Sequence, residues 1–258
     1  MHACARLRLI ALLLVALGLA PRAFAADAHD DGPRTLAITY HVAPVNRAAL
    51  REQMQASELA RFRAWKDEGV LQDYRVLFSR YVDSANWDML VLLSFAKYAD
   101  LERWKAIEQT YPAGLSAKAL ALTTSVSSVA LDLERSERLP AARDSVFMVI
   151  PYHVVIPTGE YLAYVDGYVV PQVKGWMAEG ALAGYGLYLV RYTAEQPWES
   201  LLVLEYAGDR GLGRREAVVA KVRDRLKADA NWKAISDGKK DVRVERRAVV
   251  ADALSPSR

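Results

Sequence analysis

The chain has 258 residues, 52% of them apolar, which is enough to bury a sizeable core without disulfides. Its formal charge of +3 comes from three arginines within the first 25 residues, and the remaining charges balance. This balance argues against nucleic acid as a partner. The single cysteine, Cys4, also lies in this segment, so the rest of the chain offers neither disulfides nor thiol chemistry.

Residues 1–25 are typical of a secretory signal peptide. Arg6 and Arg8 precede an apolar run at residues 9–20, which is too short for a comfortable membrane span. Small residues at Ala23 and Ala25 predict cleavage after Ala25. We therefore expect a periplasmic or secreted protein with no membrane insertion, which begins with a flexible tail at residues 26–34.

Residues 35–133 are expected to form a first structural unit. Its β-branched and aromatic residues predict strands at Thr35–Val42 and at residues 74–82, 87–95 and 126–133. Apolar residues at helical spacing predict a helix over residues 47–68, and Gly69 stands where a helix C-terminal glycine belongs. A second helix is expected at residues 100–110.

Residues 134–144 are charged and contain Pro140, which favours a linker. A second unit, residues 145–252, repeats the same order of elements, and residues 253–258 form a tail. Its strands are expected at residues 146–155, 185–193, 198–206 and 242–250, and a helix at residues 214–228. In the other helix, which Pro157 opens, Pro171 predicts a kink or break.

The two units share an internal repeat. Ten residues between Trp65 and Leu93 recur at a constant offset of 111, against roughly two matches expected from average residue usage. Upstream, the run from Tyr40 to Val42 recurs from Tyr152 at an offset of 112. A β-α-β-β-α-β order is the ferredoxin-like unit, whose sheet has one bare face. The fold class predicted is α+β: two tandem ferredoxin-like units packed sheet to sheet, as an eight-stranded pseudo-dimeric barrel within one chain.

Several matched segments resemble the dimeric α+β barrel superfamily in its tandem form, closest to its NIPSNAP-like and EthD-like branches. They are residues 69–74 with their copy 180–185, the tryptophans Trp87 and Trp198 that begin a strand, and residues 229–232. The resemblance covers the chain after the signal peptide. It implies the barrel fold, but the superfamily hosts monooxygenases, isomerases, haem enzymes and proteins without known activity, so it names no reaction.

Two histidines, His41 and His153, occupy equivalent positions near the end of the first strand of each unit. Each is either a general base or a ligand at a pocket mouth, or a polar cap that hydrogen-bonds a loop. The recurrence does not require a catalytic role, since a shared ancestor explains it. They are the candidates for catalysis.

The candidates for ligand binding are aromatic and charged residues, most of them in matched pairs. Arg80 and Arg191 end otherwise apolar strands; each either binds an anionic ligand or pairs with the carboxylate across its hairpin, Asp88 or Glu199. Glu205 replaces Ser94 on the third strand and needs a partner if it is buried. The full set is Tyr40, Tyr74, Arg80, Tyr152, Tyr185, Arg191 and Glu205.

No Gly-rich phosphate loop, nucleophile elbow or metal-ligand spacing is present, so we predict no metal and no cofactor. Lys239, Lys240, Arg243, Arg246 and Arg247 form a basic patch that is interpreted as a solvated sheet edge.

Whether the protein is an enzyme stays open. The first hypothesis is an exported protein that binds a small apolar, aromatic or carboxylate-bearing molecule. The alternatives are a cofactor-independent monooxygenase or isomerase with a strand-end histidine as base, and a haem-binding protein. The pseudo-dimer is complete within one chain, and the sequence gives no higher oligomer.

Overall fold

A computed structural model describes residues 32, 34–140, 144–194 and 196–255, so the predicted signal peptide and its expected cleavage site lie outside the described residues. The strands are β1 Thr35–Val42, β2 Asp73–Ser79, β3 Met89–Ser94, β4 Thr123–Arg138, β5 Val146–Val154, β6 Leu182–Val190, β7 Ser200–Tyr206, β8 Arg243–Glu245 and β9 Val249–Ala253. The helices are α1 Arg47–Gln53, α2 Leu59–Asp67, α3 Asp100–Glu108, α4 Ala117–Leu120, α5 Thr158–Tyr164, α6 Val170–Ala178, α7 Gly208–Gly213, α8 Arg215–Leu226 and α9 Ala230–Gly238.

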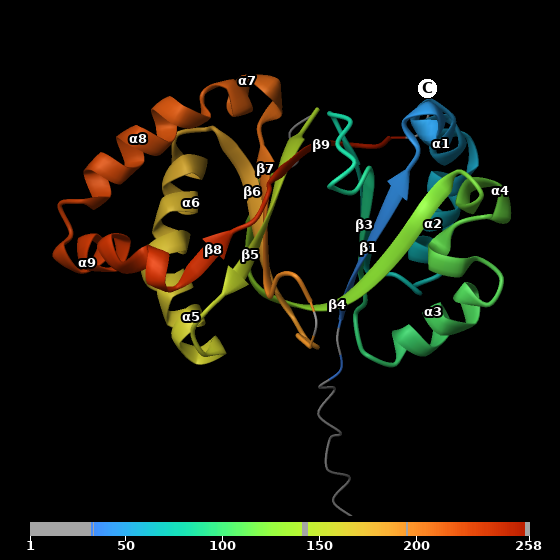
Figure 1. Cartoon of the computed structure of the whole chain (residues 1–258), viewed down its shortest axis with the longest axis horizontal. Helices are drawn as coiled ribbons and strands as arrows, with labels where there is room; N and C mark the ends of the chain where they lie inside the picture. The colour runs from blue at the N-terminus through green and yellow to red at the C-terminus, as the bar shows by residue number, and fades with distance from the viewer. Residues whose placement is uncertain (1–31, 33, 141–143, 195, 256–258) are drawn as a thin grey trace, which may run out of the picture. The chain divides into compact units, whose positions relative to one another are not determined.

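Eight of the described strands close into an antiparallel barrel, in the order β7-β6-β4-β1-β3-β2-β9-β5 and back to β7. Strand β8 pairs with β5 outside this ring. Helices α1 to α4 cover one side of the barrel and α5 to α9 the other (Figure 1). The predicted closed eight-stranded barrel with outer helices is therefore confirmed. None of the helices that the structure describes has the length and apolar character that a membrane crossing requires.

Strand alternation divides the buried side chains into three layers. In β2, Val76 and Phe78 point outward into a core beneath α1 to α4, whereas Leu77 points into the barrel. A second outer core lies beneath α5, α6, α8 and α9. Apolar side chains such as Phe147 and Leu201 pack against one another inside the barrel and form a third core between the two sheets.

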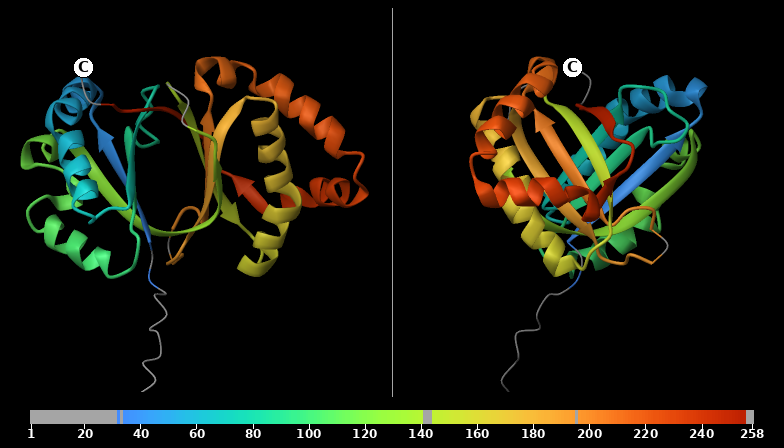
Figure 2. Two further views of the ribbon diagram at one scale, coloured as in Figure 1. Left: turned by 180° about the vertical axis from the view of Figure 1, so that it is seen from behind. Right: turned by 60° about the vertical axis from the view of Figure 1, so that its left-hand side comes forward.

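Strand pairing between the two halves closes the barrel. Strand β4 of the first half pairs with β6 of the second, and β2 pairs with β9 (Figure 2). Within each half the strand order is the same, β4-β1-β3-β2 and β9-β5-β7-β6. Barrel closure leaves none of the eight strands with an unpaired edge, which removes a site of aggregation.

Some elements differ from the sequence-based expectation. Strand β4 runs through residues 134–138, which were assigned to the linker, because it pairs with β6 as far as Arg138. The last strand is split into β8 and β9, and the short helix α7 precedes the predicted helix at residues 214–228. The predicted helix C-terminal glycines are confirmed, since Gly69 and Gly180 have φ of +68° and +69°.

Pro171 lies in the first turn of α6, after a π-helical turn at Val165–Val169. The first half has a π-helical turn at the equivalent position, Met54–Glu58, although it has no proline there. The proline is therefore tolerated by an irregularity that both halves share, and it is not the cause of that irregularity.

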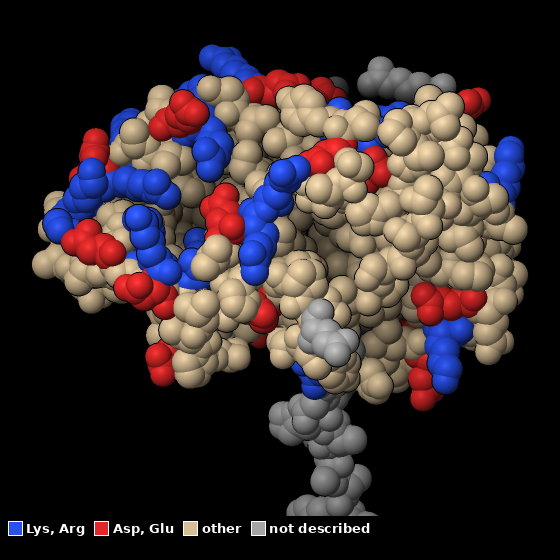
Figure 3. Space-filling view, viewed as in Figure 1, with Lys and Arg blue, Asp and Glu red and all other residues tan. Residues whose placement is uncertain are grey.

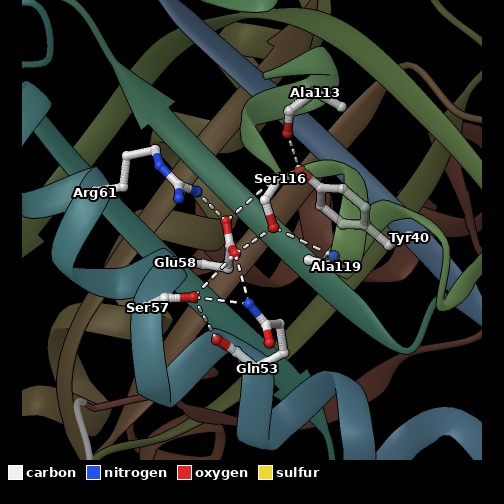
Figure 4. Close-up of polar contacts among 8 residues, drawn as sticks. All are labelled: Tyr40, Gln53, Ser57, Glu58, Arg61, Ala113, Ser116 and Ala119. Atoms are coloured by element: carbon white, nitrogen blue, oxygen red, sulfur yellow. Dashed lines mark hydrogen bonds and ion pairs between the residues drawn. The ribbon is translucent and has the colours of Figure 1, made fainter. Parts of the chain in front are cut away.

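Buried Glu58 ties the helices of the first half together (Figure 4). Its carboxylate accepts hydrogen bonds from the backbone N–H and hydroxyl of Ser116, at 3.1 and 2.6 Å, and from Gln53 Nε2 at 3.1 Å. Arg61 completes the network as an ion pair. Burial alone would raise the pKa of Glu58, but the bonds from Ser116 and Gln53 and the Arg61 charge outweigh it and lower that pKa.

Replacement of Glu58 by glutamine should lower the free energy of unfolding at pH 7 by about 2–4 kcal/mol, because an amide cannot accept all these bonds. Because the folded-state pKa of Glu58 is depressed, its stabilisation is complete above the unfolded pKa, near 4.5, and disappears as the pH falls through the folded value. The gap between wild type and Glu58→Gln in urea unfolding should therefore shrink between pH 6 and pH 3. An equal gap at every pH would contradict this role.

Candidate functional site

A cavity of about 600 Å³ opens at the end of the barrel where the β2–β3 and β6–β7 hairpins lie. We call it the hairpin-end cavity. Its walls carry the aromatic side chains of Trp87 and Trp198, its floor includes Leu90 and Leu201, and its polar lining includes Thr39, His41, Ser127, Arg246 and Arg247. Apolar walls with a few polar groups are typical of small-molecule sites.

Both halves contribute equivalent positions to this one cavity. Trp87 and Trp198, and Leu90 and Leu201, are related by the offset of 111, and Ala37 and Val149 by the offset of 112. The cavity therefore lies where the two halves meet. A single half could not form it.

The first hairpin fixes Trp87 through a turn organised by Asp83. The Asp83 carboxylate accepts hydrogen bonds from Ala85 N at 3.0 Å and Asn86 Nδ2 at 2.7 Å, and pairs with Arg247 at 2.9 Å. These bonds, the backbone one foremost, lower the pKa of Asp83 to about 2. Trp87 follows this turn, half-buried against the apolar interior of the barrel.

The two candidate histidines have different surroundings. His41 lines the hairpin-end cavity, half-exposed, and no hydrogen bond joins its ring to another described residue. The Nδ1 atom of His153 lies 3.0 and 3.1 Å from the two carboxylate oxygens of Glu199. Alternation along β5 puts His153 on the same face as Val149 and Pro151, which line the cavity, but His153 itself is not part of the lining.

The difference arises from the carboxylate that begins the third strand of each half. Asp88 accepts the N–H of Val42 at 2.7 Å, and Glu199 accepts the equivalent N–H of Val154 at 2.8 Å. Asp88 also pairs with Arg47, whereas the longer Glu199 reaches His153. Glu199 is one methylene longer than Asp88 and has no arginine partner among the described residues, and of the two histidines only His153 has a carboxylate beside its ring.

Arg80 and Arg191 do not have the partners expected for them. Arg80 binds Asp252 through Nε at 2.9 Å and Nη2 at 2.7 Å, and also pairs with Asp209. Arg191 pairs with Asp132 at 3.1 Å. Asp252 and Asp209 belong to the second half, so Arg80 links the two halves. Both arginines are occupied by carboxylates of this chain, and neither lines the hairpin-end cavity.

The four candidate tyrosines face the helices and do not line this cavity. Tyr40 donates its hydroxyl to the carbonyl of Ala113 (Figure 4), and burial raises its pKa well above the usual value. Tyr74 stacks on Phe62 at 5.6 Å between ring centres. Tyr152 and Tyr185 belong to the outer core of the second half.

Glu205 is buried inside the barrel, at the end opposite the histidines. Its partners are Arg138 at 2.9 Å, Arg75 at 3.7 Å and the Ser145 hydroxyl at 2.7 Å. Neither Arg191 nor His153 is among these partners, so Glu205 has no contact with the other polar candidates of the second half. These residues border a polar groove of about 850 Å³.

The residues that form the hairpin-end cavity were only partly predicted. Thr39 and Ser127 were not singled out, and the two tryptophans were named only as residues that begin a strand. The recurrence of a tryptophan at each hairpin was the available signal. Within the part of the chain that the structure describes, no three acidic, histidine or cysteine side chains gather as a metal site would require.

No protein-family model matches the sequence, and no curated protein matches it. Solved structures match it in fold. A proposed monooxygenase from Lactobacillus acidophilus NCFM has 12% identity and a TM-score of 0.54, covering 87% of this chain and 94% of its own. An anthrone oxidase-like protein has 12% identity and a TM-score of 0.55, covering 88% and 93%. A haem-binding protein from Thermus thermophilus has 11% identity and a TM-score of 0.50, covering 87% and 92%. At 12% identity or less, these likenesses show a shared fold.

Replacement of Arg80 by glutamine should lower the free energy of unfolding by about 1–2 kcal/mol, because it removes a bidentate ion pair between the halves. The matched control is Lys66→Gln, which breaks a surface pair with Asp73 and should cost less than about 0.5 kcal/mol. Urea denaturation measures both. Equal losses for the two variants would contradict a special role for Arg80.

Proposed function

We propose that this chain binds a small aromatic, carboxylate-bearing molecule in the hairpin-end cavity. The proposal rests mainly on one observation: two tryptophans, Trp87 and Trp198, line the same cavity as an arginine, Arg246. Arg246 lines the cavity, and no carboxylate among the described residues pairs with it. Tryptophan faces supply apolar contact and an arginine supplies a fork for a carboxylate.

The cavity also has features that would orient such a ligand. The backbone N–H of Arg246 donates to the carbonyl of Pro151 at 2.8 Å, which fixes the base of this side chain beside β5. Arg247 is held by Asp83, so the two adjacent arginines have separate roles: one stabilises the first hairpin, and the other remains open to a ligand.

A direct test uses 1-naphthoate as the probe in isothermal titration calorimetry, with 1-naphthalenemethanol as its neutral analogue. Trp87→Ala and Arg246→Gln should each weaken naphthoate binding by about tenfold, since each removes one main contact. Only the tryptophan variant should weaken binding of the alcohol.

The matched control is Tyr192→Ala, which removes an aromatic side chain from the second hairpin that is 66% exposed and lies outside the lining. It should bind naphthoate as the wild type does. Unchanged affinity in both Trp87→Ala and Arg246→Gln would refute the proposal.

A second candidate function is cofactor-independent oxygenation or isomerisation, with His41 as the base. His41 lines the cavity, which supports this role. No described residue forms a hydrogen bond with its ring nitrogens, so the ring is available to take a proton. His153 is the alternative base, oriented by Glu199. With anthrone as the probe, oxygen uptake that rises with pH and is lost in His41→Ala would support the first assignment, and loss only in His153→Ala the second.

The surroundings of the two histidines support haem binding less well than they support a general base. A histidine that ligates a metal usually donates its other ring N–H to a carbonyl or carboxylate. His41 lies in the cavity without such a partner among the described residues, and His153 has the partner but lies outside the lining. A Soret band that develops on titration with haem and is lost in His41→Ala would instead support haem ligation by His41.

We also propose that the barrel arose by duplication of a ferredoxin-like unit, with units at residues 35–133 and 145–252. The constant repeat offset and the matching strand order of the two halves support this. Within the superfamily, the matched segments around Gly69 and Gly180 favour the NIPSNAP-like and EthD-like branches. The N-terminal sequence supports export to the periplasm or beyond after cleavage at Ala25, which N-terminal sequencing of the purified protein would test.

A further inference from the structure

A second cavity, of about 220 Å³, lies between the sheet of the second half and its helices. It is bordered by α6, α8 and the turn that leads from α9 into β8 (Figure 1). None of the residues that line it also lines the hairpin-end cavity. Since a water molecule takes about 30 Å³ in the liquid, it could hold roughly seven of them, or one small organic molecule.

Five cationic side chains line this helix-side cavity, against a single carboxylate, Glu245. They are Arg215, Arg223, Lys239, Lys240 and Arg243. Among the residues that the structure describes, none of these five forms an ion pair with a carboxylate. Figure 3 shows Lys and Arg side chains gathered over the half that carries α8 and α9. Such an excess of positive charge around a recess favours an anionic occupant.

Arg243 is held in place by aromatic rings. Its guanidinium carbon lies 3.7 Å from the centre of the Tyr152 ring and 5.3 Å from that of Tyr164, and Nη1 lies 3.4 Å from the hydroxyl of Tyr161. Cation–π contacts orient a guanidinium without neutralising its charge. Burial raises the pKa of Tyr152 and Tyr164, although the Arg243 charge opposes the effect, so both phenols keep their protons.

Two buried hydrogen-bond donors in this lining have no partner among the described residues. They are the indole N–H of Trp176, a side chain that is 8% exposed, and the Nε–H of Arg215. Buried donors in folded proteins are nearly always satisfied, and an acceptor bound in the cavity would give both of these donors a partner.

The first half lacks this arrangement at the equivalent tryptophan. Trp65, which corresponds to Trp176, packs edge-on against Phe62 at 5.2 Å and Trp104 at 5.4 Å between ring centres. Its space is filled by aromatic rings, whereas the second half leaves a cavity with cations. Of the two equivalent tryptophans, only Trp176 of the second half borders a cationic cavity.

We propose that the helix-side cavity is a second ligand site, which binds a small phosphate monoester. A phosphate dianion matches five cations and one carboxylate better than a carboxylate monoanion does. It offers several acceptor oxygens to the unpaired N–H groups of Trp176 and Arg215 and to the guanidinium charge of Arg243. The tyrosine rings give the organic part of the ester an apolar wall.

Isothermal titration calorimetry with phenyl phosphate tests this site, with inorganic phosphate, benzoate and benzyl alcohol as comparison probes. Phenyl phosphate should bind most tightly, inorganic phosphate and benzoate more weakly, and benzyl alcohol not measurably. Arg243→Gln should weaken phenyl phosphate binding by at least about tenfold. Lys240→Gln, at an exposed position that cannot disturb the core, should weaken it about two- to threefold.

The matched control is Lys227→Gln, which removes an exposed lysine from the end of α8 that pairs with Asp224 and lines neither cavity. It should leave phenyl phosphate binding unchanged. Three results would overturn the proposal: no heat of binding with phenyl phosphate, affinity for benzoate equal to or above that for phenyl phosphate, or unchanged affinity in both Arg243→Gln and Lys240→Gln. Should Arg243→Gln fail to fold in a thermal melt, Lys240→Gln alone decides.

Discussion

Closure of the barrel by strand pairing between the two halves is the constraint on which the rest of the structure depends. The β4–β6 pairing extends from Leu131 opposite Val190 to Arg138 opposite Gly184, and the β2–β9 pairing joins the other edges. Each sheet thereby covers the inner face of the other and buries apolar side chains that neither half could bury alone. The hairpin-end cavity and the Arg80 cluster both exist only because the edges meet.

Equivalent positions of the two halves differ in their side-chain contacts, while the strand order of the halves is the same. Asp88 and Glu199 both accept the N–H at the end of the first strand, yet only Glu199 reaches a histidine. Trp65 closes its space with neighbouring rings, whereas Trp176 borders a cationic cavity. The shared contacts maintain the barrel, and the differences at single side chains give each half its own chemistry.

The barrel was predictable because strand alternation, helical spacing and the repeat are local patterns that survive in both copies. The partners of Arg80 were not, since Asp209 and Asp252 are 129 and 172 residues away and meet it only after the barrel closes. The basic patch was interpreted as one solvated edge. In the structure, the split between β8 and β9 sends Arg243 toward the helices and Arg246 to the barrel end, and no local pattern revealed that division.

We propose that the hairpin-end cavity, formed by both halves, holds an aromatic carboxylate. A crystal structure of the protein soaked with 1-naphthoate would test this binding mode. We expect density for the naphthyl rings between Trp87 and Trp198, with the carboxylate beside Arg246. Density for the ligand at the polar groove around Glu205 or in the helix-side cavity, with the hairpin-end cavity empty, would contradict it.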